Sequence, residues 1–282
     1  MSDTSRRVTP RTWAVAGSVA AIALTGVQIA PVGRSLIPAA YAGEASEAGE
    51  SGHTTPTSEA GEAGESGHAA ASSEAGEAGE SGVVVPEGPA EFLTELGKFE
   101  ATHLIVAALY ASGDTAQAVE HLEQSHHAYY DDLEHDLEEY GAKEFEDEAE
   151  DFADLVTDGA STKKVAKAAD KVLTAIAAAR KSIGAPARDQ LFAAKALLDT
   201  AAADYAAGVD ETRIEAPQEY RDAWGFVEAA RIIARELAAS EDDRTAKAGQ
   251  DALAQIDTVA PLFPALNATQ AGGDLSLLAA AA

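Results

Sequence analysis

Cysteine is absent from the 282-residue chain, and Met1 is its only methionine. These absences exclude disulfides, thiolate metal sites, iron–sulfur clusters, attached c-type haem, thiol nucleophiles and thioether copper sites. Basic residues are scarce, because 20 lysines and arginines stand against 48 acidic residues and give a formal charge of −28. Such an acidic surface would repel a phosphate backbone, so we expect no nucleic-acid partner. Metal ions that accept carboxylate and imidazole ligands remain candidates.

The first 42 residues have the pattern of a secretory signal peptide. Three arginines precede the uncharged stretch 13–30, and residues 40–42 read Ala-Tyr-Ala, as at a cleavage site. We therefore expect a periplasmic or otherwise exported protein, and leave Sec and twin-arginine export open. The mature chain would have no membrane span, and it would be membrane-tethered only if the signal stayed uncleaved.

Residues 43–90 form a low-complexity linker with three copies of the unit Ser-Glu-Ala-Gly-Glu. The linker holds ten glutamates, two histidines and no lysine or arginine. A segment with so little to bury cannot offset its ordering entropy, so we predict a disordered acidic linker. It would act as a self-repelling spacer, or its glutamates and histidines would gather cations weakly.

The remainder, residues 91–282, is predicted to be a helical bundle domain. Apolar residues recur there with a period near 3.6, between glycine, proline and helix-capping residues, and we identify no convincing strand. Gly113 and Gly184 stand at expected helix ends, and Pro217 at a helix start. The expected helices cover about 89–111, 114–140, 143–158, 162–183, a segment from 186, a segment from 217, and 240 to near 261. Asp114 is the expected N-cap of the second, and Ser240 begins a capping-box relative at the seventh. Short connections between six or seven helices predict an all-α antiparallel bundle.

Five of the seven histidines lie between positions 103 and 135, and two of them replace apolar residues on helix faces expected to be buried. His103 and His126 are these two, and each follows a glutamate by three residues, Glu100 and Glu123 respectively. Side chains three residues apart lie on the same face of a helix, so the two Glu-x-x-His pairs could converge. We interpret His121, His127 and His135 as solvent-exposed residues, with His121 and His127 at most at the edge of a site.

Carboxylate-bridged di-metal bundles use this local unit, with further glutamates from other helices. Glu219 and Asp222, one turn apart on the sixth predicted helix, could supply the additional carboxylates. The predicted metal ligands are Glu100, His103, Glu123, His126, Glu219 and Asp222. The competing interpretation is that His103 and His126 are core residues, hydrogen-bonded to a neighbouring tyrosine or carboxylate.

Three short motifs resemble a group of uncharacterised exported bacterial proteins. They are Glu100-Ala-Thr-His103-Leu, Leu109-Tyr110-x-x-Gly113 and Glu219-Tyr-Arg-Asp222-Ala-Trp-Gly-Phe226. This resemblance implies a Gly/Glu-rich linker joined to an all-helical domain, and no defined activity. The domain is more remotely similar to the imelysin-type periplasmic iron-uptake proteins. Their Gly-x-His-x-x-Glu signature is not met, because Ala101 and Val106 occupy the glycine and glutamate positions, so no residue is carried over.

The sequence therefore favours an exported helical bundle that binds a transition metal ion. Iron is the preferred metal, and zinc, manganese and copper are the alternatives. A second hypothesis is a non-catalytic cell-envelope interaction module, with another envelope protein as its partner and structural core histidines. Enzymatic activity, for example as a di-iron oxidase, is the least supported interpretation, because it needs two close metals and an open coordination site.

Overall fold

The computed structural model describes residues 87–282 except 126 and 129. The predicted signal peptide, almost all of the predicted linker and His126 therefore lie outside the described residues. Within these residues the structure confirms the all-helical bundle. The α-helices are α1 (Pro89–Ser112), α2 (Thr115–Gln124), α3 (Asp131–Glu139), α4 (Glu146–Thr157), α5 (Thr162–Ile183), α6 (Ala187–Gly208), α7 (Pro217–Ala238), α8 (Asp243–Ile256) and α9 (Ser276–Ala281), with a 3-10 helix η1 (Asp257–Leu262) and two short strands β1 (Val209–Asp210) and β2 (Arg213–Ile214).

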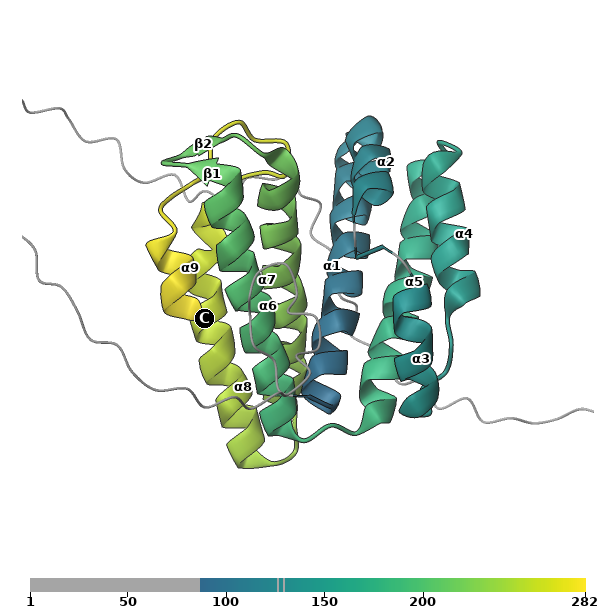
Figure 1. Ribbon diagram of the computed structural model, residues 1–282, viewed down its shortest axis with the longest axis vertical. Helices are drawn as coiled ribbons and strands as arrows, with labels where there is room; N and C mark the ends of the chain where they lie inside the picture. Colours follow the sequence, from purple (N-terminus) through teal and green to yellow (C-terminus); the bar gives the residue numbers. More distant parts are fainter. Residues whose placement is uncertain (1–86, 126, 129) are drawn as a thin grey trace, which may run out of the picture. The chain divides into compact units, whose positions relative to one another are not determined.

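Helix α1 runs through the middle of the domain, between α6 and α7 on one side and α4 and α5 on the other (Figure 1). Leu93 belongs to the apolar core shared with α6 and α7, whereas Phe92 and Phe99 belong to a second core shared with α4 and α5. A helix that contributes to two cores is apolar on most sides, as expected for a central helix. Polar side chains on α1 are therefore held inside the protein.

Small residues allow the helices of the C-terminal half to approach each other closely. A Cβ atom built on Gly225 of α7 would lie 2.6 Å from Cδ1 of Ile105 in α1. One built on Gly249 of α8 would lie 2.2 Å from the backbone nitrogen of Ala238 in α7. Both distances are too short for carbon. At Gly225 the end of the Ile105 side chain would have to move, whereas at Gly249 of α8 the backbone of α7 leaves no room for a side chain.

The predicted helix ends at Gly113 and Gly184 are confirmed, since both residues are left-handed C-caps with φ of 93° and 62°. Two predicted N-caps differ from the structure. Asp114 stands at the start of α2 but caps no backbone N–H, because its carboxylate accepts hydrogen bonds from Ser112 and Asn267 instead. The start of α8 is capped by Asp242, not by Ser240.

The long second helix predicted at 114–140 was wrong, because the chain divides there into α2 and α3. Ser125 ends α2 in an extended conformation, and its hydroxyl lies 2.9 Å from the hydroxyl of Thr102 in α1. The hydroxyl of Tyr130 accepts a hydrogen bond from the backbone N–H of Phe145. These contacts hold the two ends of the break, Ser125 against α1 and Tyr130 against the start of α4. The two-residue hairpin of β1 and β2 is a further departure from the prediction of no strand.

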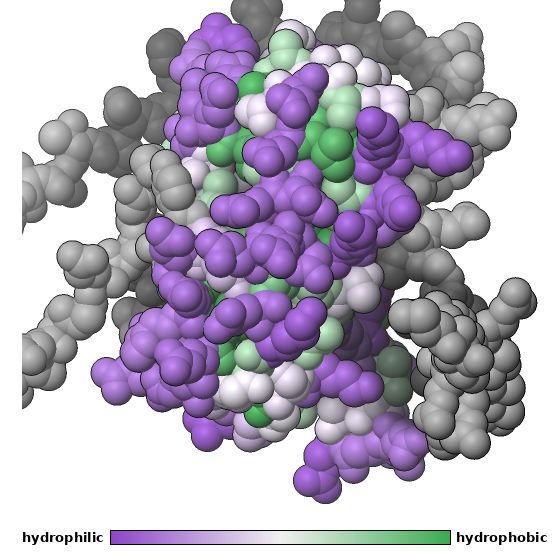
Figure 2. Space-filling view, turned by 90° about the vertical axis from the view of Figure 1, so that its right-hand side faces the viewer, coloured by the Kyte–Doolittle hydropathy of each residue, from purple (hydrophilic) through white to green (hydrophobic). Residues whose placement is uncertain are grey.

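The outer face of α4 and α5 is mainly hydrophilic (Figure 2). Lys163, Lys164 and Lys167 of α5 are exposed there, and Lys171 lies 3.4 Å from the carboxylate of Asp151 in α4. This supports the interpretation that the lysine-rich helix presents a solvated face beside an acidic neighbour. Among the described residues no helix is both long enough and apolar enough to cross a bilayer.

Candidate metal centre

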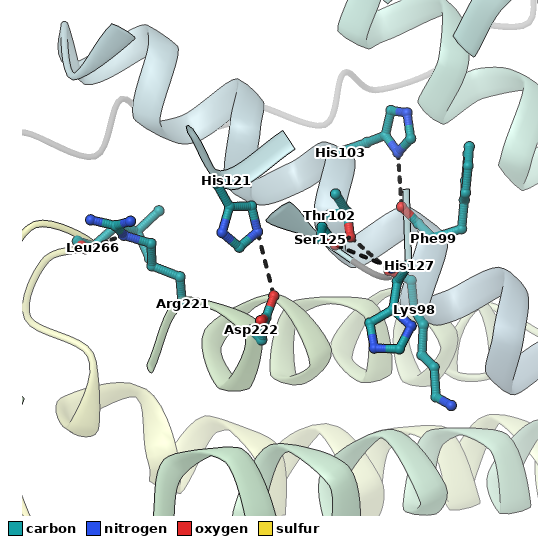
Figure 3. Close-up of polar contacts among 10 residues, drawn as sticks. All are labelled: Lys98, Phe99, Thr102, His103, His121, Ser125, His127, Arg221, Asp222 and Leu266. Carbon is teal, nitrogen blue, oxygen red and sulfur yellow. Dashed lines mark hydrogen bonds and ion pairs between the residues drawn. The ribbon is translucent and has the colours of Figure 1, made fainter. Parts of the chain in front are cut away.

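A buried histidine faces an aspartate where α2 meets α7. His121 is only 1 % exposed, and its Nε2 atom lies 3.4 Å from Oδ1 of Asp222 (Figure 3). Neither ring nitrogen of His121 has a hydrogen-bond partner among the described residues. Buried polar atoms are nearly always hydrogen-bonded, so an imidazole left in this state calls for an explanation.

The sequence places His121 in the interior through the register of α2. Ala118 and His121 are the buried residues of that helix, and their spacing of three positions puts them on one face. On α7, Asp222 lies between the buried residues Arg221 and Ala223, and its side chain is 15 % exposed. The two helices therefore direct an imidazole and a carboxyl group toward the same place.

The surroundings of this pair disfavour charge on both groups. Burial lowers the pKa of His121 to about 4, with the positive charge of Arg221 and the neighbouring His127 acting in the same direction. Burial also raises the pKa of the Asp222 carboxyl to about 8, assisted by the charges of Asp204 and Glu219 and opposed by Arg221. Near neutral pH the imidazole is uncharged and most of the Asp222 carboxyl is protonated.

Hydrogen bonds fix the groups around the pair. The Arg221 side chain donates from Nε to the carbonyl of Leu266 at 3.1 Å and from Nη2 to Oε1 of Gln117 at 2.8 Å. The backbone N–H of His127 donates to the hydroxyl of Ser125 at 3.3 Å. Two other acceptors therefore hold the Arg221 guanidinium. Among the described residues it forms no direct ion pair with Asp222.

The predicted ligand Glu100 has a different partner. Its carboxylate forms a buried ion pair with Nη2 of Arg180 in α5, and Nη1 of the same guanidinium lies 2.8 Å from Glu236 in α7. Glu100 and Arg180 are both almost fully buried. An arginine that holds two carboxylates joins α1, α5 and α7, so the contacts assign Glu100 a structural role.

The predicted ligand His103 is buried in an aromatic environment. Its Nδ1 atom lies 2.8 Å from the carbonyl oxygen of Phe99, and its ring centroid lies 4.3 Å from that of Phe99 and 5.3 Å from that of Phe152. Burial lowers the pKa of His103 to about 4. Figure 3 shows the contrast between the two histidines. The His103 ring contacts the carbonyl oxygen of Phe99, whereas the His121 ring faces the carboxyl group of Asp222. His103 is thus a hydrogen-bonded core histidine, as in the competing interpretation, but its partner is a backbone carbonyl oxygen and not the expected tyrosine or carboxylate.

The remaining predicted ligands fall in different places. Glu123 is exposed on α2, Glu219 is partly buried on α7, and His126 lies outside the described residues. The described residues hold no group of three or more histidine, aspartate or glutamate side chains gathered closely enough to enclose a metal ion. Only Asp222, of the six predicted ligands, has a described contact with a histidine.

Sequence reasoning missed His121 because it placed the buried face of α2 one position away. The apolar character of Val119 and Leu122 favours a different face of the helix, but both residues are only partly buried. Ala118, His121 and Ser125 are buried instead. The available signal was the spacing of these three smaller or polar residues, which also follows the helical period.

A family model described as the iron permease-associated 4-helix bundle domain matches residues 186–276. No curated protein and no solved structure matches the chain. The matched segment, less than half of the chain, contains α6, α7, α8 and η1, and α1 packs against two of these helices from outside it. The C-terminal part of the bundle is therefore similar to an iron permease-associated domain, and the matched segment includes Asp204, Glu219 and Asp222 but not His121.

Proposed function

We propose that this chain is an exported accessory module of iron uptake, which binds iron as its cargo and serves a membrane permease. The observation that carries the proposal is the match of residues 186–276 to an iron permease-associated bundle. The predicted signal peptide is consistent with a place outside the cytoplasm. The permease is proposed as the partner because the matched domain is iron permease-associated.

The donor chemistry of the domain suits this cargo. Iron ions accept imidazole nitrogen and carboxylate oxygen as ligands. His121 and Asp222 offer one of each, and Nε2 of His121 lies 3.4 Å from Oδ1 of Asp222. An imidazole must be neutral to bind a metal, and burial keeps His121 neutral. Of the residues predicted from sequence, Asp222 and Glu219 stay in the proposed cargo site, whereas Glu100 and His103 have structural partners.

The charge of the chain supports the capture of cations. Residues 91–282 hold 37 acidic and 16 basic side chains, a formal charge of −21, and the resulting negative potential raises the local concentration of metal cations and their association rates. The ten glutamates of the linker add to this field next to the domain. The acidic surface would therefore attract iron, and the interior donors would bind it.

The experiment compares the exported fraction and the iron supply of cells with and without this chain. We expect the chain to be recovered outside the cytoplasm with about one equivalent of iron by elemental analysis. We also expect cells lacking it to accumulate radioactive iron more slowly when iron is scarce. A chain recovered with background iron, together with unchanged uptake in cells that lack it, would contradict the proposal.

A further inference from the structure

We propose that His121 and Asp222 are the primary ligands of an iron site at the junction of α2, α6 and α7, and that Asp204 and Glu219 complete it. This inference rests on the proposed function, since it names the site at which the cargo binds. It replaces the predicted centre on α1 with one whose imidazole comes from α2.

The first argument is the unsatisfied imidazole. An uncompensated buried polar group costs on the order of 1–3 kcal/mol, and both ring nitrogens of His121 lack a hydrogen-bond partner among the described residues. An apolar residue of similar size would avoid that cost. His103 provides the contrast, because its Nδ1 atom has the Phe99 carbonyl as a partner and its ring packs between aromatic rings. Retention of an orphaned imidazole is explained if a ligand binds it.

The second argument is the spacing of the two donor atoms. Ligand atoms bound about 2.1 Å from one metal ion stand roughly 3.0–3.4 Å apart for octahedral to tetrahedral angles. Nε2 of His121 and Oδ1 of Asp222 lie 3.4 Å apart, which fits this range. A direct N–H···O hydrogen bond would usually be shorter, at about 2.7–3.2 Å. The separation of Nε2 and Oδ1 is therefore compatible with both atoms binding one ion.

The third argument is the charge of the surrounding groups. Asp204 of α6 and Glu219 of α7 lie near enough to Asp222 for their charges to act on it, and Arg221 is hydrogen-bonded to Leu266 and Gln117. A divalent cation bound beside Asp222 would add positive charge next to these three carboxyl groups. Asp204 and Glu219 are only partly buried, so their side chains can turn toward the ion when it enters. This accounts for the lack of a closed ligand group in the described residues.

The test is an anaerobic titration of the full chain with ferrous iron alone, competed by a chelator of known affinity. His121→Leu removes the ligand and keeps an apolar side chain of similar size, and Asp222→Asn removes a carboxylate while keeping its shape. His103→Gln is the matched control, because it changes the other buried histidine outside the proposed site. Thermal unfolding of each variant without metal accompanies the titration.

We expect the unaltered chain and His103→Gln to bind one tight equivalent of ferrous iron. His121→Leu should bind it at least about 100-fold more weakly, since loss of a group that merely supports a ligand already costs 10–100-fold. Because His121 makes no hydrogen bond, the leucine variant should be as stable as the unaltered chain or more stable. Together these results separate a lost ligand from a damaged fold.

Two other outcomes overturn the inference in different ways. Tight binding that survives in His121→Leu would remove the site from this junction and leave the proposed function intact. A chain that binds no ferrous iron above the weak affinity of its acidic linker would contradict both the site and the binding of iron as cargo.

Discussion

Asp222 should make the metal-free protein lose stability as the pH rises from about 6.5 to 8. Its pKa is raised to about 8 in the folded protein from an ordinary value of 3.8. In this range the unfolded chain holds an ionised Asp222, whereas the folded protein still binds the proton. Stability therefore falls by about 1.4 kcal/mol for each pH unit and becomes level above pH 8.

The buried histidines act on the other side of this range. His103 and His121 have pKa values lowered to about 4 from 6.5, so below pH 6.5 the unfolded chain takes up protons that the folded protein excludes. Each histidine then removes up to about 3 kcal/mol of stability as the pH falls from 6.5 to 4. Asp222 contributes more stability as the pH falls, but this single group offsets only part of the loss from two histidines. These three groups together predict a stability maximum near pH 6.5.

Asp222→Asn isolates the contribution of the carboxyl group. Between pH 6.5 and 8 the difference in unfolding free energy between this variant and the unaltered chain should change by about 2 kcal/mol in favour of the variant. Urea unfolding of both proteins with a chelator present measures this difference, since a bound cation would alter the titration. Parallel stability curves for the two proteins across this range would refute the burial argument for Asp222.

Three further substitutions test the packing that holds the site in place. Arg180→Met should destabilise the domain by about 3–5 kcal/mol in urea unfolding, because it leaves the buried Glu100 carboxylate uncompensated. Gly249→Ala should lower the melting temperature, at a cost of about 1–3 kcal/mol, since its Cβ would collide with the backbone at Ala238; an unchanged melting temperature would contradict the close approach of α7 and α8. Tyr205→Phe should cost about 1 kcal/mol of unfolding free energy, because its hydroxyl donates a 2.7 Å hydrogen bond to the carbonyl of Gly273. Hydrogen exchange should then become faster in the segment around Gly273.

The parts of the fold that follow from local sequence were predicted closely. The helix predicted at 162–183 has those bounds in the structure, because its apolar period ends at a glycine that adopts a left-handed C-cap. The helix from Pro217 begins where a first-turn proline favours it. The predicted helix at 114–140 failed since no glycine or proline marks the break at Ser125. At that break the Ser125 hydroxyl contacts Thr102 in another helix, and local sequence gives no sign of such a contact.

The candidate site was predictable only in its chemistry. Imidazole and carboxylate were expected, and Asp222 was among the predicted residues, because the composition excludes other ligand types. Its partner depended on a one-position shift in the buried face of α2, which the apolar residues Val119 and Leu122 concealed. The role of Glu100 depended on Arg180, which lies 80 residues away in sequence. Pairings between distant helices arise from packing, and local spacing contains no information about them.

Crystals of the full chain grown or soaked with ferrous iron, measured at the iron absorption edge, test the central claim most directly. The account predicts an anomalous peak about 2.1 Å from Nε2 of His121 and from a carboxylate oxygen of Asp222. A strong iron peak bonded to other side chains, with the imidazole of His121 left without a metal, would contradict it.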